Sequence, residues 1–358
     1  MTYRNRIVNI SIFFIFFLAS FIVAELVVRA APGLFCSGYQ PSQNDKIVYE
    51  LIPNYKPNPL NLKDIRFKDS ISPQGLNDRF FSEAKLPHIF RIAIVGDSTS
   101  FGWKVERKDS FPKVLETLLN QNKIENTFEV INFSVPGYNT AQECEVIKQK
   151  VICFHPDLVI LVYCSNDTHV CNLIKTQINF LNYFYNKSYL IPIFLKWVDV
   201  SIKHVPNPLL QNEWLLIKKN TLGLFYYNEL IYPYPGLEAT PIVNGNPPGS
   251  VKNVPERYWY MLGYKNYGIH LKAIDTFLSQ NNIQFVSTGF FDAVALAINK
   301  KVGIKHIFNL SDLHVIKNNR ANVMLDPTHD PHLNKKGHLL VAESLYDYLR
   351  GMSFLPIK

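Results

Sequence analysis

Three short apolar runs mark the middle of the chain, and each ends where the sequence turns polar. Residues 91–95, 128–133 and 157–163 are rich in β-branched, aliphatic and aromatic side chains, which predicts buried strands. After the second run, Thr140 and Glu143 have the spacing of a capping box and predict the start of a helix. Strands that alternate with helices predict an α/β fold around a parallel sheet.

The same alternation resumes near the end of the chain. Residues 258–278 and 339–349 have helical periodicity, and residues 283–287 form another short apolar run. Between them and the first part, residues 172–255 contain many aromatic residues and prolines without a clear period. We therefore expect an insertion of irregular pattern at about 172–255.

The N-terminus carries a long apolar stretch of a different kind. Residues 7–24 contain no charged side chain, and as a helix they would reach about 27 Å, close to the hydrocarbon thickness of a bilayer. Arg4 and Arg6 precede this stretch, so the positive-inside rule places the rest of the chain outside the cytoplasm. A single-pass membrane anchor is the first expectation. A cleaved signal peptide, with a small-residue cleavage site at 28–30, is the alternative.

These patterns predict one large α/β domain rather than several. We expect a membrane anchor or signal peptide at 1–30, a linker or lead-in at 31–88, and the α/β domain with its insertion at 89–352. Hydrophobic residues make up 47% and charged residues 18%, which excludes wholesale disorder. The net charge of +8 comes without a Lys/Arg block or zinc-finger spacing, so nucleic-acid binding is not expected. Five cysteines lack the spacing of a disulfide framework and are expected to be buried thiols.

The sharpest chemical signal follows the first predicted strand. Residues 96–102 read Gly-Asp-Ser-Thr-Ser-Phe-Gly, and open α/β sheets place their sites at the carboxyl ends of strands. Ser98 is therefore a candidate nucleophile, with Gly96 permitting the tight turn before it. Taken alone, the segment also fits an ordinary strand-to-helix turn with serine as the N-cap.

Three further segments lie at the same predicted edge of the sheet. Gly137 follows the second strand, where its N–H can approach an oxyanion with no Cβ in the way, although Pro-Gly often marks only a turn. Asn166 follows the third strand and can offer an amide N–H, although a structural Asx turn is the usual role. Acidic and imidazole groups at 326–332, before the last helix, can supply a base for Ser98.

In these segments the sequence resembles the SGNH (GDSL-type) serine hydrolases. The resemblance covers roughly 88–170 and 256–350, about half of the chain, and its blocks occur in the family's order at 96–102, 137, 166–167 and 326–332. It implies a three-layer α/β/α, flavodoxin-like fold with a central parallel sheet. The resemblance does not cover the N-terminal transmembrane helix, which the apolar stretch at 7–24 predicts to precede this fold.

Carried over to this chain, the resemblance implies a serine mechanism without a cofactor or a metal. Ser98 would be the nucleophile, and His332, oriented by Asp330, would be the general base. The N–H groups of Ser98 and Gly137 and the side-chain amide of Asn166 would form the oxyanion hole.

Two features depart from the family's pattern. Cys164 stands where the third block usually has glycine, which puts the geometry of that block in question. The last block is usually Asp-x-x-His, a spacing that Asp326 and His329 have. The sequence His-Leu-Asn at 332–334 favours His332 as the base, with Asp330 two residues before it as its partner. Asp326 and His329 remain the alternative pair.

The expected function is a serine-dependent esterase or deacylase that acts outside the cytoplasm. An O-acyl(acetyl)transferase that modifies a cell-envelope polysaccharide is the alternative, because the same residues serve both reactions. The expected partners are an acyl-ester small molecule or an acylated glycan, and the membrane through the N-terminal helix. A metal-dependent hydrolase built on the histidines of 326–338 and a binding module with a decayed site are the remaining interpretations.

Overall fold

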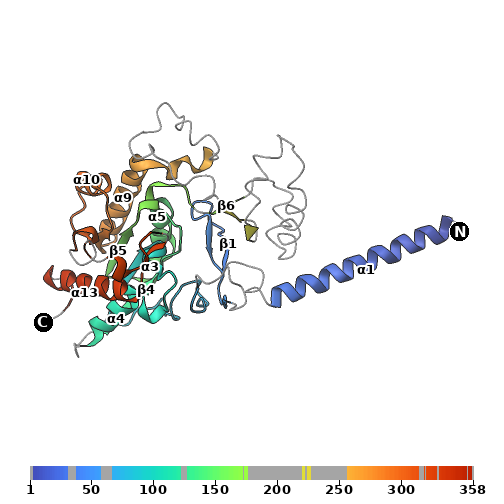
Figure 1. Cartoon of the computed structure of the whole chain (residues 1–358), viewed down its shortest axis with the longest axis horizontal. Helices are drawn as coiled ribbons and strands as arrows, with labels where there is room; N and C mark the ends of the chain where they lie inside the picture. The colour runs from blue at the N-terminus through green and yellow to red at the C-terminus, as the bar shows by residue number, and fades with distance from the viewer. Residues whose placement is uncertain are drawn as a thin grey trace.

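In the computed structural model of the chain, a five-stranded sheet lies at the centre of the folded domain (Figure 1). All neighbouring strands are parallel, and their order is β10 (Ile307–Asn309), β9 (Gln284–Gly289), β5 (Leu158–Tyr163), β3 (Ile89–Gly96) and β4 (Thr127–Asn132). Numbered along the chain, this order is 2-1-3-4-5, which is the flavodoxin-like order. The predicted parallel α/β sheet is confirmed.

The structure describes residues 3–30, 38–57, 67–121, 127–171, 173–175, 220–221, 224–226, 256–313, 318, 320–328, 330–352 and 354–356. The insertion predicted at about 172–255 lies largely outside these residues. Its described parts are three short strands, which form an antiparallel sheet in the order β6 (Leu173–Lys175), β8 (Leu224–Tyr226) and β7 (Asn220–Thr221).

Each face of the sheet has its own hydrophobic core, because side chains alternate between the two faces of a strand. In β3, Ala93 and Val95 pack on the side of α5 (Thr140–Gln149), α9 (Gly263–Gln280) and α10 (Ala293–Val302). Ile92 and Ile94 pack on the other side, with α4 (Phe111–Gln121) and α13 (Lys335–Gly351). The predicted three-layer α/β/α arrangement is therefore confirmed.

The start of α5 corrects one prediction. The N-cap is Asn139, whose side-chain oxygen accepts the N–H of Gln142 at 3.1 Å, and the Gln142 side chain accepts the N–H of Asn139 at 3.3 Å. The capping box predicted at Thr140 and Glu143 is wrong by one residue, because Asn and Gln satisfy the same two N–H groups. Thr140 and Glu143 lie inside the helix instead, and both are buried.

The segment predicted as a linker or lead-in at 31–88 packs into the domain where the structure describes it. Its strands β1 (Tyr39–Pro41) and β2 (Tyr49–Leu51) pair with each other, and Tyr49, Tyr55 and Phe67 belong to the same core as α5 and α9. The sequence showed no helical or strand periodicity here because the buried side chains belong to turns and to strands of only three residues.

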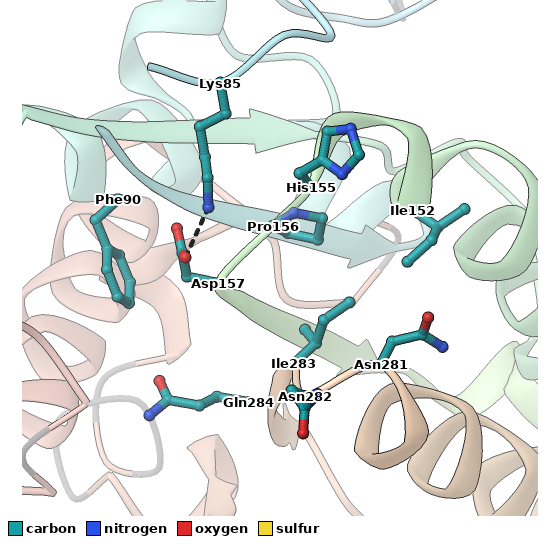
Figure 2. A pocket seen from close by; sticks show the side chains of 10 residues that line it. All are labelled: Lys85, Phe90, Ile152, His155, Pro156, Asp157, Asn281, Asn282, Ile283 and Gln284. Carbon is teal, nitrogen blue, oxygen red and sulfur yellow. Dashed lines mark hydrogen bonds and ion pairs between the residues drawn. The ribbon is translucent and has the colours of Figure 1, made fainter. Parts of the chain in front are cut away.

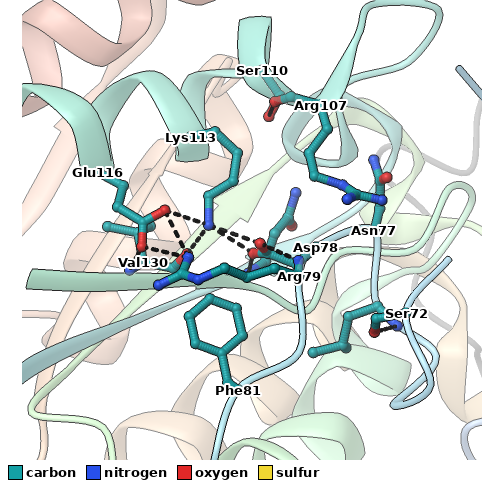
Figure 3. A network of polar contacts seen from close by, with 12 residues as sticks. Ser72, Asn77, Asp78, Arg79, Phe81, Arg107, Ser110, Lys113, Glu116 and Val130 are labelled. Atoms are coloured by element: carbon teal, nitrogen blue, oxygen red, sulfur yellow. Dashed lines mark hydrogen bonds and ion pairs between the residues drawn. The ribbon is translucent and has the colours of Figure 1, made fainter. Parts of the chain in front are cut away.

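A buried ion pair joins the lead-in to α4. Figure 3 shows Lys113 of α4 pointing at Asp78 of the lead-in, with Nζ at 2.9 Å from both carboxylate oxygens. Lys113 also pairs with Glu116 at 2.7 Å. Burial raises the pKa of Asp78, and the Lys113 ammonium opposes that shift. The lead-in is thus held to the sheet domain by charge as well as by apolar contact.

The predicted transmembrane helix at 7–24 lies in α1 (Tyr3–Ala30), which extends away from the sheet domain (Figure 1). Residues 12–18 are all large apolar side chains, and each is between 46% and 71% exposed. Within the part of the chain that the structure describes, no helix has both the length and the apolarity needed to cross a membrane.

Candidate active site

Ser98 lies just beyond the carboxyl end of β3, as the first residue of α3 (Ser98–Phe101). Asp97 caps this short helix through its side chain. A Cβ atom at Gly96 would lie 3.0 Å from the carbonyl oxygen of Val162 on the neighbouring strand, closer than ordinary contact allows. The turn that presents the Ser98 hydroxyl therefore depends on glycine at this position.

His332 reaches Ser98 from 234 positions further along the chain. The two strands β11 (Met324–Asp326) and β12 (Asp330–Leu333) form a hairpin before α13. His332 Nε2 lies 2.9 Å from Ser98 Oγ, and His332 Nδ1 lies 2.6 Å from Asp330 Oδ1. Residues two apart on a strand point to the same side, which explains how a two-residue spacing brings carboxylate and imidazole together.

The remaining acidic and imidazole side chains that the sequence suggested in this region do not take part in the contact with Ser98 where the structure describes them. Asp326 lies on β11, opposite Asp330, and its carboxylate accepts the N–H of Thr328 at 2.9 Å. His329 lies outside the described residues. His338 of α13 accepts the N–H of Phe111 at 3.2 Å, and burial lowers the pKa of His338 to about 3. His338 is therefore neutral and links α13 to α4.

Gly137 and Asn166 lie at neighbouring strand ends and are joined through one hydrogen bond. Gly137 has φ +79°, a conformation that side chains with a Cβ rarely adopt. The Asn166 amide donates to the carbonyl oxygen of Tyr138 at 3.0 Å. A primary amide has two N–H groups, so the bond to Tyr138 uses only one of them. The structure thus brings both predicted oxyanion-hole residues to the carboxyl edge that carries Ser98.

Two tyrosines brace the Gly137 turn from the lead-in. Tyr49 OH donates to the carbonyl oxygen of Pro136 at 2.9 Å, and Tyr138 OH donates to the carbonyl oxygen of Tyr49 at 2.5 Å. Their rings meet edge to face with centroids 5.1 Å apart. Burial raises the pKa of Tyr138, so its hydroxyl remains a donor. Sequence reasoning missed Tyr49, because nothing in the lead-in pattern indicated a contact with residue 136.

Cys164 fits at the glycine position of the third block without strain. Its φ of −135° is extended, so a Cβ is tolerated. Its N–H donates to Asp167 Oδ2 at 2.6 Å, and the Thr99 hydroxyl donates to its Sγ at 3.6 Å. Burial raises the pKa of the Cys164 thiol, which is therefore neutral.

A buried carboxyl pair supports the strand end that carries Asn166. Asp167 accepts hydrogen bonds from the N–H of Cys164 and, at 3.0 Å, from the hydroxyl of Thr140. Glu143 is fully buried beside it, and burial together with the charge of Asp167 raises the pKa of Glu143 well above its usual range. Burial also raises the pKa of Asp167, but its two donors lower it, whereas Glu143 receives no such donor. We therefore assign the proton of this pair to Glu143.

A hollow lies at the edge of the sheet opposite to Ser98. It has a volume of about 510 Å³ and is lined by residues near the amino ends of the strands, including Phe90, Asp157 and Gln284 (Figure 2). Both Asp157 oxygens have partners at 2.7 Å, Lys85 Nζ and the N–H of Arg91. This hollow is separate from the edge that holds Ser98, because all strands of the sheet run parallel.

Two further groups of side chains bear on the chemistry. Among the described residues, no three His, Cys, Asp or Glu side chains are placed to hold a metal ion. The four cysteines of the described part, Cys144, Cys153, Cys164 and Cys171, are free thiols. Cys36 lies outside the described residues.

No family model matches the chain, and no curated protein matches it. Among solved structures, it is similar to the psychrotrophic esterase EstA from Pseudoalteromonas sp., with 12% identity, a TM-score of 0.40, and coverage of 73% of this chain and 97% of that one. A GDSL-like lipase from Bacteroides thetaiotaomicron VPI-5482 has 10% identity, a TM-score of 0.37, and coverage of 76% and 93%. A variant of an acetyl xylan esterase from Geobacillus stearothermophilus has 11% identity, a TM-score of 0.40, and coverage of 77% and 100%.

Proposed function

We propose that the chain is a serine hydrolase of the SGNH (GDSL) type that acts on ester bonds. The observation that carries this proposal is the hydrogen-bonded series from Ser98 Oγ to His332 Nε2, at 2.9 Å, and from His332 Nδ1 to Asp330, at 2.6 Å. A nucleophile, a base within hydrogen-bond reach and a group that orients the base are what nucleophilic catalysis requires.

The geometry supports a two-step reaction. Ser98 Oγ attacks the ester carbonyl carbon while His332 Nε2 takes the hydroxyl proton, and Asp330 holds the Nδ1–H of the ring. The carbonyl oxygen becomes an oxyanion, for which the N–H groups of Ser98, Gly137 and the Asn166 side chain are the available donors. Losing one such donor costs about 3–4 kcal/mol of transition-state stabilisation.

Collapse of the tetrahedral intermediate breaks the bond to the alcohol oxygen, which receives the proton from His332. This leaves an acyl group on Ser98. Water, deprotonated by His332, then attacks the acyl-enzyme and releases the acid and free Ser98. A sugar hydroxyl in place of water would give acyl transfer to a cell-envelope glycan.

We infer, from the uncharged sequence of residues 7–24 taken as a whole, that the N-terminal segment attaches this hydrolase to a membrane and that the domain acts outside the cytoplasm. Seven consecutive apolar side chains at 12–18 cover every side of the helix, and all are exposed. An amphipathic helix lying on a protein surface has only an apolar stripe, so an apolar surface on all sides favours a lipid environment. Arg4 and Arg6 favour a cytoplasmic N-terminus.

A fluorophosphonate probe tests the serine mechanism in the full chain. We expect the probe to label Ser98, located by mass spectrometry, and expect Ser98→Ala and His332→Ala each to lower p-nitrophenyl ester turnover by several orders of magnitude. Ser279→Ala, which removes an exposed serine of α9, is the matched control and should leave both signals unchanged.

Three outcomes would contradict parts of this proposal. Active protein without a labelled Ser98 would exclude the serine mechanism. A severe loss in His329→Ala with a mild one in His332→Ala would make Asp326 and His329 the acid–base pair. An acyl group that moves from a donor ester to an added glycan, rather than to water, would establish transfer in place of hydrolysis.

A further inference from the structure

The turn after the Ser98 helix has an unusual backbone. Gly102 ends α3 with φ +87°, and Lys104 has φ +62°, in the left-handed region that residues other than glycine seldom adopt. Such a conformation costs on the order of 1 kcal/mol or more and tends to persist where a surrounding contact requires it. The contacts of Trp103 and Lys104 identify what this turn holds.

Lys104 contacts the carboxylate of the proposed acid–base pair. Its Nζ lies 2.5 Å from Asp330 Oδ2, while Asp330 Oδ1 lies 2.6 Å from His332 Nδ1. Each carboxylate oxygen therefore has its own partner. Burial would raise the pKa of Asp330, but the hydrogen bonds from Lys104 and His332 lower it. Asp330 is thus ionised and held from both sides.

Trp103 contacts the other member of the pair. Its indole stacks on the His332 ring with centroids 5.3 Å apart and an interplanar angle of 24°. Consecutive residues of one turn therefore fix both the imidazole and the carboxylate. The same turn follows directly on the helix of Ser98, so the nucleophile and the two clamping side chains come from one short segment.

We infer that Lys104 is a positioning residue of the proposed hydrolase, which holds Asp330 in the rotamer that meets His332 and offsets the charge of that carboxylate. This inference rests on the proposed function. The Asp330 side chain is 18% exposed, so without Lys104 its Oδ2 would face water and the carboxylate could rotate away from the imidazole. A lysine without this role would leave both the turnover and its pH dependence unchanged.

The charge of Lys104 has a second effect, on the pH dependence. The titratable groups around His332 are Asp97 before α3, Asp330 on β12 and His338 on α13, with Lys104 behind Asp330. Removing the ammonium leaves the Asp330 charge uncompensated, and an uncompensated carboxylate favours the protonated imidazole. The acid limb of kcat/KM should therefore move to higher pH.

The experiment compares Lys104→Met and Lys104→Arg with wild type. We expect the Met variant to lose about 10- to 100-fold in kcat, with little change in KM, and to show the shifted acid limb. The Arg variant keeps the charge and should retain most of both properties. Lys108→Met is the matched control, because Lys108 is a lysine four positions on whose side chain is 73% exposed and pairs with Glu106.

The outcomes separate this inference from the proposed function. Absence of fluorophosphonate labelling at Ser98 in wild type would defeat the proposed function itself. If wild type is labelled normally and Lys104→Met has the same kcat and the same acid limb of kcat/KM as wild type, only the role of Lys104 is overturned. An equal shift in Lys108→Met would also overturn it, since surface charge in general would then be the cause. If the Met variant does not fold, Lys104→Gln provides the same comparison.

Discussion

At the scale of single residues, the candidate site depends on hydrogen bonds and on the protonation states of a few buried side chains. Ser98, His332 and Asp330 form one hydrogen-bonded series, and His338, a few residues further on, is kept neutral by burial. Beneath the site, Glu143 carries the proton that allows two carboxyls to be buried side by side. The first set serves the proposed chemistry, whereas Glu143 affects folding.

The protonation of Glu143 makes stability depend on pH in a predictable direction. The pKa of Glu143 is raised in the folded state above the ordinary 4.5 of the unfolded chain. Its favourable contribution is therefore complete below about pH 4.5 and is lost as the pH rises toward the folded-state pKa, by up to about 1.4 kcal/mol per pH unit. Glu143→Gln removes this loss, so its stability relative to wild type should increase from pH 5 to pH 8.

Urea unfolding at both pH values measures this difference. Glu343→Gln, at an exposed position of α13, is the control and should show no such increase. If the difference between Glu143→Gln and wild type is the same at pH 5 and pH 8, Glu143 is not the protonated member of the pair.

At the scale of elements, the site depends on where strands end and which segments brace them. Ser98, Gly137 and Asn166 follow β3, β4 and β5, which are adjacent in the order β5-β3-β4. That is why their proximity could be predicted from sequence: the carboxyl ends of parallel strands share one edge. The two-residue spacing of Asp330 and His332 became interpretable only once both were found on one strand.

The bracing elements could not be predicted in the same way. Tyr49 contacts residue 136 and Lys104 contacts residue 330, and no local pattern connects positions so distant in sequence. The capping box at α5 was displaced by one residue because two overlapping pairs of residues satisfy the same rule. Local sequence patterns were thus sufficient to predict the strands, whereas the contacts of Tyr49 and Lys104 depend on the tertiary structure.

The hydrogen bond from Tyr49 of β2 to the Gly137 turn predicts a positioning role for Tyr49, which does not contact the proposed reacting atoms. Tyr49→Phe removes the hydrogen bond to Pro136 and should cost about 1 kcal/mol of stability. Because the Gly137 turn loses a support, kcat should fall several-fold while KM changes little. Steady-state kinetics and thermal unfolding measure both effects.

Tyr260→Phe is the matched control for this change. Tyr260 OH also donates to a backbone carbonyl, that of Lys46, but at 3.5 Å and away from the Gly137 turn. If both variants lose stability and neither loses kcat, the brace is structural and does not position the oxyanion hole.

At the scale of the whole molecule, the chain combines a sheet domain with an apolar helix that projects from it. The lead-in between them is part of the domain where it is described, through Tyr49, Phe67 and the Asp78–Lys113 pair. A membrane attachment through α1 would therefore connect to the domain through a segment that also contacts the candidate active site.

The proposed attachment predicts how the full chain fractionates. It should stay with membranes through an alkaline carbonate wash, because apolar burial does not depend on charge. Protease added outside sealed cells should cleave the domain. Release by carbonate would contradict an embedded helix, and protection from the protease would contradict the orientation.

The distance of 234 positions between Ser98 and His332 has a consequence for synthesis of the chain. The serine, its oxyanion donors and the turn with Lys104 are all made early, whereas the proposed base and its carboxylate follow together on β12 near the end. Asp330 and His332 come from the same strand of the β11–β12 hairpin, but the bond to Ser98 and the contacts of Lys104 and Trp103 form only when this hairpin docks on the sheet domain. If the proposed function holds, an emerging polypeptide keeps Ser98 without its base until β12 docks, and the onset of esterase activity would mark completion of the fold.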